Sequence, residues 1–228
     1  MLIISASCIC NSDGLKGVNQ DNLLFSGQIL PEVNGGLAGV PSAKFAQDKP
    51  FVAAVFDGQG SAGAKAACFA AGAFRGVSDR LRSEQDLAAL LSELHSEFSA
   101  KAPADTGVSA AAVLISGDRL YLSNFGSCRA YLRRGDGLYV LSRRESGTDF
   151  LGLSALDAVR PYALSGRLQK GDTLLLCTDG LYAALDSTEL LTQLSAPAAD
   201  PDLLKNLLHK AASGGTADSV TAILLRFE

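Results

Sequence analysis

Positive charge is not in excess in this 228-residue chain, which carries 20 Lys and Arg against 24 Asp and Glu, a formal net charge of -4. Because nucleic-acid-binding proteins gather Lys and Arg on one face, the composition disfavours a nucleic-acid partner. Long apolar runs are also lacking, since no stretch reaches the roughly 18 to 20 residues of a membrane span. The N-terminal segment lacks the basic region of a signal peptide. We therefore expect a cytoplasmic protein with no membrane or nucleic-acid partner.

Histidine, tryptophan and cysteine are scarce, with two His, no Trp and five Cys. An odd number of cysteines, lying mostly in apolar runs, suits buried reduced thiols better than a disulfide framework. Cys8 and Cys10 form one closely spaced pair, without the second pair that a structural zinc site needs. His95 and His209 fall on amphipathic helical patterns, and we interpret them as packing or surface residues. The sequence thus disfavours zinc.

Small and apolar residues are abundant, since 47% of the chain is hydrophobic and 23 residues are glycine. This composition is sufficient for a tightly packed core and argues against disorder. No repeat, low-complexity tract or long linker interrupts the chain, and domains cluster around roughly 100 to 200 residues. We expect one domain over residues 1–228, acting as a monomer.

The spacing of apolar residues predicts strands and helices in separate blocks. Strands are expected at 2–9, 51–56, 109–116, 119–125, 128–133, 138–141, 161–168 and 219–227, and in the apolar run that begins at 172. Helices are expected at 61–80, at 83–98 with Ser83 and Asp86 as a capping box, after an Asp186 N-cap with Glu189 at N3, and at 201–212. This order favours an α+β fold of antiparallel sheet under helices over alternating β-α-β units.

Two regions between these elements have their own signals. The turn sequences SGDR and RRGDG indicate hairpins, so we predict an antiparallel meander over 109–141. Residues 28–50 contain three prolines and several glycines, which predicts a long surface loop.

The stretch VFDGQGSAGAK offers two alternative interpretations. Gly58, Gly60 and Gly63 have the G-x-G-x-x-G spacing that holds a dinucleotide pyrophosphate. Asp57, however, stands directly before the first glycine, where its charge would face that anion. No acidic residue ends a second strand about 20 residues later, as a ribose contact requires. The alternative is a carboxylate held at a strand end to bind a metal.

Four aspartates stand where the backbone changes direction: Asp21, Asp57, Asp179 and Asp218. A lone Asp-Gly pair after a strand is usually a tight hairpin turn. Both Asp-Gly pairs here lead into expected helices, where no hairpin turn is needed. If the four carboxylates meet, their repulsion raises their pKa values, and a divalent cation neutralises them. Oxygen ligands without clustered His or Cys favour Mg²⁺ or Mn²⁺.

Five segments, in order and in spacing, resemble the metal-dependent, type 2C (PPM) serine/threonine protein phosphatases in their compact bacterial form. They are GLKGVNQD, AAVFDGQGS, LYLSNFGSCRAYL, GDTLLLCTDGLYAALDSTEL and ADSVTAILL. Each motif alone is weak, but five in order over nearly the whole chain are specific. The resemblance implies a four-layer α-β-β-α sandwich, with two mainly antiparallel sheets flanked by helix pairs.

The resemblance also implies two Mn²⁺ or Mg²⁺ ions at one end of the sandwich. Carried over by position, Asp57 would bridge both ions, and Asp179 and Asp218 would complete the first. The Gly58 carbonyl and Asp21 would hold the second, partly through waters. These ligands would act in catalysis through a water or hydroxide that bridges the ions and attacks phosphoserine or phosphothreonine. Phosphorylated proteins, such as the substrates of a serine/threonine kinase, would be the partners.

The chain departs from the family pattern at several positions. Lys16 stands where the family usually has a phosphate-binding Arg, and it keeps the charge without the bidentate fork. Ser127 and Ala183 replace aspartates that the resemblance assigns to a third metal, so that site is expected to be absent. The flap segment after residue 145 is also very short.

These departures leave alternatives to an active general phosphatase. One is a catalytically degenerate phosphatase fold that serves as a binding or regulatory module. Another is a phosphatase of the related sporulation and stress-response group, acting on an anti-sigma-factor antagonist.

Overall fold

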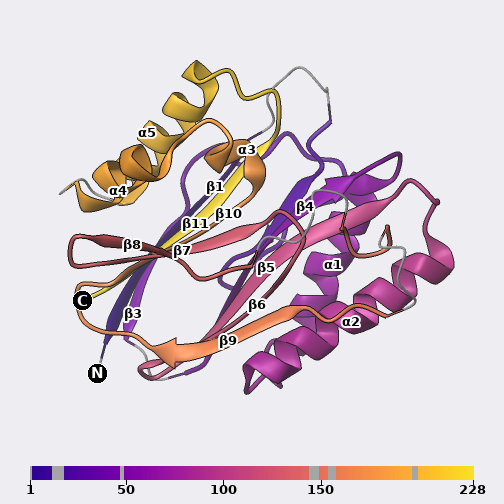
Figure 1. The fold of residues 1–228 in the computed structure, drawn as a ribbon, viewed down its shortest axis with the longest axis horizontal. Helices are drawn as coiled ribbons and strands as arrows, with labels where there is room; N and C mark the ends of the chain where they lie inside the picture. Colours follow the sequence, from indigo (N-terminus) through magenta and orange to yellow (C-terminus); the bar gives the residue numbers. More distant parts are fainter. Residues whose placement is uncertain (1, 12–17, 47–48, 144–148, 154–157, 197–199) are drawn as a thin grey trace.

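The computed structural model describes residues 2–11, 18–46, 49–143, 149–153, 158–196 and 200–228. Figure 1 shows two sheets packed face to face, with helices on both outer sides. This is the four-layer α-β-β-α arrangement that the sequence resemblance predicts. None of the helices in these ranges has the length and apolar character needed to cross a membrane.

The first sheet has six strands in the order β3-β1-β11-β10-β7-β8, and every neighbouring pair is antiparallel. The strands are β1 (Ile3–Asn11), β3 (Ser42–Ala46), β7 (Arg129–Arg134), β8 (Gly137–Val140), β10 (Thr173–Cys177) and β11 (Val220–Phe227). The last strand in the chain, β11, thus lies in the middle of the sheet, between β1 and β10.

The second sheet has five strands in the order β2-β4-β5-β6-β9, again antiparallel throughout. They are β2 (Asp21–Leu24), β4 (Phe51–Gln59), β5 (Gly107–Ser116), β6 (Arg119–Phe125) and β9 (Tyr162–Arg167). Helices α1 (Gly63–Val77) and α2 (Glu84–Lys101) cover this sheet, whereas α3 (Asp179–Tyr182), α4 (Ser187–Ser195) and α5 (Asp200–Ser213) cover the other.

The core consists of three apolar layers, because successive side chains of the central strands point alternately to the two faces of each sheet. On β10, Leu174 and Leu176 point into the layer between the two sheets, and Leu175 points into the layer under α4 and α5. On β5, Val113 faces the inter-sheet layer and Leu114 faces α1 and α2. Side chains alternate between the faces of a strand, so a strand buried on both faces appears in sequence as a continuous apolar run.

The helix boundaries follow local capping signals. Ser83 accepts a hydrogen bond from the Asp86 N–H, and the Asp86 side chain accepts one from the Ser83 N–H, which is the predicted capping box of α2. Asp186 caps α4 by accepting a hydrogen bond from the Glu189 N–H, as predicted. His95 is buried on α2, where its Nδ1 accepts a hydrogen bond from the Gly152 N–H, a packing role consistent with the sequence interpretation.

Two predictions about the connections are wrong. Residues 28–50 include the edge strand β3 and are not only loop. The segment 109–141 is not one meander, because β5 and β6 pair in one sheet while β7 and β8 pair in the other. The chain crosses between the sheets at Gly126, whose φ of 86° favours glycine.

The cysteines agree with the expectation of reduced thiols. All five are free, and all except Cys68 are buried. Burial is the main reason that the pKa values of Cys8 and Cys10 rise to about 12, so these thiols stay protonated at neutral pH.

Candidate metal centre

Asp21 and Asp57 are direct partners across the β2–β4 ladder. Partners in an antiparallel ladder lie on the same face of the sheet, so both carboxyl groups are on one side. Both side chains are nearly buried, with exposed fractions of 3% for Asp21 and 9% for Asp57. The ladder therefore brings two carboxyl groups together at the end of the second sheet.

Gly58 is required at this strand end because other backbone passes very close. A Cβ on Gly58 would lie 2.1 Å from the Gly63 carbonyl oxygen and 2.7 Å from the Gln20 oxygen, closer than any side chain tolerates. The Gly58 N–H also donates a hydrogen bond to the Gln20 oxygen. The Asp-Gly sequence thus lets α1 begin against the end of β4.

The G-x-G-x-x-G alternative is wrong for this strand. A dinucleotide site of that kind needs parallel strands joined through a helix. Here β4 lies between β2 and β5, and both pairings are antiparallel.

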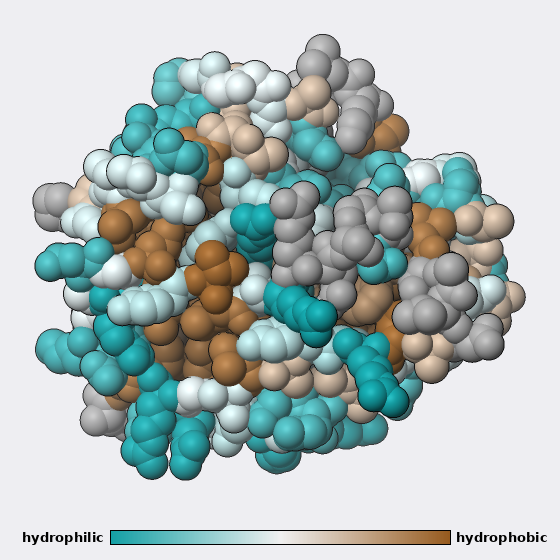
Figure 2. All heavy atoms as spheres, viewed as in Figure 1, coloured by the Kyte–Doolittle hydropathy of each residue, from teal (hydrophilic) through white to brown (hydrophobic). Residues whose placement is uncertain are grey.

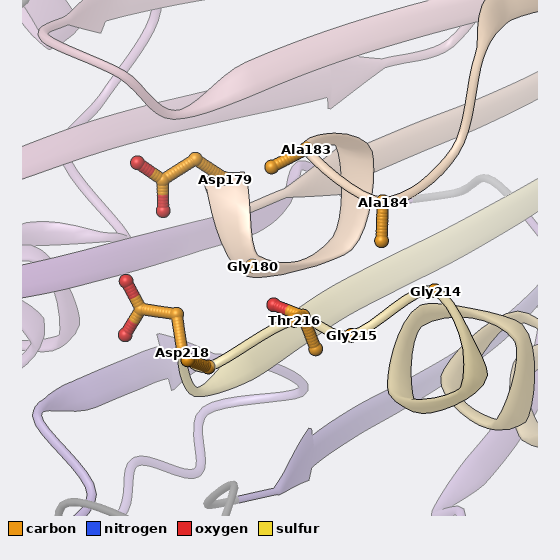
Figure 3. Close-up of a pocket in the computed structure, with 9 residues that line it drawn as sticks. Asp179, Gly180, Ala183, Ala184, Gly214, Gly215, Thr216 and Asp218 are labelled. Carbon is orange, nitrogen blue, oxygen red and sulfur yellow. The ribbon is translucent and has the colours of Figure 1, made fainter.

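Asp179 and Asp218 form a second pair, beside the ends of the neighbouring strands β10 and β11 of the first sheet. Asp179 is the first residue of α3 and is separated from β10 only by Thr178, and Asp218 lies two residues before β11. Figure 3 shows both carboxylates on the same side of the chain, one above the other. Gly180 allows this approach, because a Cβ there would lie 2.0 Å from the Ser219 carbonyl oxygen.

Thr178 connects the two pairs across the end of the sandwich. Its Oγ1 donates a hydrogen bond of 2.9 Å to Asp21 Oδ2, and the same oxygen accepts one of 3.1 Å from the Thr221 N–H. One hydroxyl therefore links β10 and β11 of the first sheet to β2 of the second. Thr178 is not among the site residues predicted from the sequence, although it stands directly before Asp179-Gly180.

The electrostatics of the two buried carboxyl groups reflect this convergence. Burial raises the pKa of Asp21 to about 8, and the charges of Asp218 and Asp179 add to the effect, while hydrogen bonds from Thr221 and Thr178 oppose it. Burial also raises the pKa of Asp57 well above its usual value, followed by the charges of Asp21, Asp179 and Asp218. Asp179 and Asp218 thus lie close enough to Asp21 and Asp57 for their charges to raise both pKa values.

Ser127 and Tyr182 extend the site toward β7. Ser127 Oγ donates a hydrogen bond of 3.3 Å to Asp57 Oδ2, and the Tyr182 hydroxyl donates one of 2.7 Å to the Ser127 carbonyl. The Arg129 guanidinium lies 3.8 Å from the centre of the Tyr182 ring, a cation–π contact. Burial raises the pKa of Tyr182, so its hydroxyl is a neutral donor. Ala183, the other departure from the family pattern, follows Tyr182 at the end of α3.

Replacing Tyr182 with Phe is expected to lower the free energy of unfolding by about 1 kcal/mol, because the Ser127 carbonyl loses its donor while the ring under Arg129 remains. Urea denaturation measures the change. Tyr139→Phe is the matched control, since Tyr139 on β8 is 53% exposed, and its effect should stay within about 0.5 kcal/mol. Equal effects of the two variants would contradict a role for the Tyr182 hydroxyl.

The donor set fits a hard divalent cation by its chemistry. Carboxylates with raised pKa values are neutralised by a cation, and oxygen ligands suit Mg²⁺ and Mn²⁺. As the side chains stand, no three His, Cys, Asp or Glu residues in the described ranges already form a metal-binding group. Lys16, the predicted phosphate-binding residue, lies outside the described residues.

The comparisons with known proteins point to one family. The family described as stage II sporulation protein E (SpoIIE) matches residues 47–228. A search of the curated proteins found no match.

Several solved structures have the same fold over almost their whole length. One is "PppA, a key regulatory component of T6SS in Pseudomonas aeruginosa", with 21% identity, a TM-score of 0.76, and coverage of 99% of this chain and 98% of that chain. Another is the catalytic domain of the serine/threonine protein phosphatase PstP in complex with 2 manganese ions, with 20% identity, a TM-score of 0.78, and coverage of 100% and 99%. The S. agalactiae serine/threonine phosphatase has 17% identity, a TM-score of 0.79, and coverage of 99% and 100%.

Proposed function

Because the chain belongs to the SpoIIE-type PPM family of serine/threonine phosphatases, we propose that it removes phosphate from phosphoserine and phosphothreonine in proteins with the help of two Mn²⁺ or Mg²⁺ ions. The observation that supports the proposal is that Asp21 and Asp57 pair on adjacent strands, with Asp179 and Asp218 close enough for their charges to raise the pKa values of both. Thr178 joins the pairs by its hydrogen bond to Asp21.

The proposed ligands follow the predicted roles. Asp57 would bridge both ions, Asp179 and Asp218 would complete the first, and Asp21 with the Gly58 carbonyl would hold the second. Two bound cations would supply a water of lowered pKa as nucleophile and a clamp for the phosphoryl group. The structure of PstP with manganese, which has the same fold, supports this choice of metal.

The chain's own residues prepare the site for this chemistry. Ser127 and Thr178 each donate a hydrogen bond to one carboxyl oxygen, on Asp57 and Asp21 respectively, and so fix the orientation of both side chains. Burial removes most water from these carboxyl groups, which strengthens their attraction to a cation. Lys16, which is not among the residues that the structure describes, would contact the substrate phosphate.

The test is a metal titration of the purified chain. With Mn²⁺ it should hydrolyse p-nitrophenyl phosphate and release phosphate from phosphoserine and phosphothreonine peptides, and a chelator should abolish both reactions. Phosphorylated anti-sigma-factor antagonists belong in the substrate screen, because the family match favours that class. Turnover that is unaffected by chelation, or absent with every metal and substrate, would contradict the proposal.

A second candidate function is a phosphopeptide-binding or regulatory module without turnover. Ser127 favours it, because a neutral hydroxyl, in contact with Asp57, stands where the family has an aspartate. Ala183 adds a second loss at the end of α3. Calorimetry in millimolar Mn²⁺ separates the candidates, since the module binds a phosphopeptide and leaves it intact.

A further inference from the structure

A pocket of about 490 Å³ opens beside Asp179 and Asp218, between α3 and the loop that precedes β11. Figure 3 shows the two carboxylates at one end of it and Ala184 and Gly214 at the other, with Thr216 between them. Apart from the two aspartates, its walls consist of alanine, glycine and Thr216. The pocket is thus continuous with the proposed metal site and carries no other charged side chain.

The shape of the pocket follows from its small residues. A Cβ on Gly214 would lie 3.0 Å from the Ala184 Cβ, so these two residues close the far end in tight contact. Gly215, by contrast, has no side chain, open space at the position of a Cβ and a φ of 81°, a conformation that glycine adopts at low cost. The loop therefore borders the pocket without filling it.

We propose that this pocket receives the side chain of a residue next to the phosphorylated residue of the substrate, and that it favours an uncharged, apolar side chain. The inference rests on the proposed function, in which Asp179 and Asp218 would hold a cation and the substrate phosphate would bind at that cation. Neighbouring Cα atoms in a peptide are about 3.8 Å apart, so a flanking side chain lies within reach of a pocket that begins at those carboxylates. With Asp179 and Asp218 occupied by a cation in the proposed function, the other walls are alanine, glycine and Thr216. Their methyl groups match an apolar side chain and offer a charged one no partner.

Binding at such a pocket distinguishes protein substrates from small ones. Contacts made by a part of the substrate remote from the reacting atoms can contribute to the rate of the chemical step. A phosphopeptide gains these contacts, whereas p-nitrophenyl phosphate has no flanking residue and gains none.

The experiment fills the pocket with Thr216→Trp and compares kcat/KM for three substrates in Mn²⁺. These are a phosphothreonine peptide flanked by leucine, the same peptide flanked by glycine, and p-nitrophenyl phosphate. The leucine peptide should be the better peptide for the wild type, and the substitution should lower its kcat/KM by about 10-fold. The value for p-nitrophenyl phosphate should change by less than about 2-fold, as expected for a contact that this substrate does not make.

Thr188→Trp is the matched control, because Thr188 is exposed in the first turn of α4 and does not line the pocket. It should leave all three values unchanged. If Thr216→Trp fails to fold, Ala217→Leu fills the pocket from the same loop and should give the same difference between substrates. Equal loss for peptides and p-nitrophenyl phosphate, or no preference for leucine in the wild type, would overturn the inference.

A wild-type protein without turnover would overturn the proposed function and still leave the pocket testable. Fluorescence polarisation with the labelled leucine peptide then measures binding directly. Binding at least about 10-fold tighter for the wild type than for Thr216→Trp supports the pocket as a peptide subsite. Equal binding, or none, rejects it.

Discussion

Replacing Asp57 with Asn is expected to lower kcat/KM for p-nitrophenyl phosphate in Mn²⁺ by about 1,000-fold or more, a loss of about 4 kcal/mol in transition-state stabilisation. Asp57 is the residue that we propose bridges both cations, and it lies against Asp21 in the β2–β4 ladder. An amide of the same shape removes the negative charge and one of the two oxygen donors. The measurement is steady-state kinetics over a range of Mn²⁺ concentrations.

Asp118→Asn is the control of identical chemistry. Asp118 forms an exposed ion pair with Arg167, and exposed pairs contribute little, so this variant should retain wild-type kinetics. Equal turnover by the Asp57 variant and the wild type would remove the basis for assigning these aspartates to a metal centre.

The metal-free protein is expected to lose stability as the pH rises toward 8. The pKa of Asp21 is raised to about 8 in the folded chain, against about 3.9 for an unfolded aspartate. Between these values the folded state binds more protons, so the stabilisation is complete below about pH 4 and is lost as the pH rises through the folded pKa. The slope is about 1.4 kcal/mol per pH unit for each extra proton bound.

Bound Mn²⁺ replaces the protons, so the rise in melting temperature that it produces should be larger near pH 8 than near pH 5.5. Thermal unfolding with a chelator or with Mn²⁺ at both pH values measures this. Asp21→Asn should flatten the pH dependence of the metal-free protein and reduce the gain from Mn²⁺, whereas Asp118→Asn should change neither. A metal-free wild type whose pH profile equals that of Asp21→Asn would contradict the prediction.

Elements with strong local signals could be predicted from the sequence. The capping box at Ser83 and the N-cap at Asp186 need only neighbouring residues, and both are as predicted. The strand β3 was missed, because its side chains alternate only between half-buried and exposed at the edge of the sheet, which leaves little hydrophobic contrast. The strand β2 has only four residues, all of them buried, so its sequence shows no alternation of apolar and polar residues.

Pairing between distant segments could not be predicted from local patterns. Two consecutive hairpins look the same in sequence whether they share a sheet or face each other, and here β6 and β7 lie in different sheets. The same limit applies at the site. The aspartates are marked by their Asp-Gly and pre-strand positions. The hydrogen bond from Thr178 to Asp21 spans 157 residues, so the residues around Thr178 do not predict its partner.

Because different sheets position the two pairs of aspartates, the geometry of the site depends on how the two sheets pack against each other. Asp21 and Asp57 are fixed within one sheet, whereas Asp179 follows β10 and Asp218 precedes β11 of the other. The spacing between the pairs therefore depends on the apolar layer that separates the sheets, where Val113 and Leu176 pack. A substitution that opens a cavity in this layer, far from the proposed metal ligands, would let the two sheets shift relative to each other and would lower the affinity for cations. Such a mutation can leave the fold unchanged and still reduce metal binding.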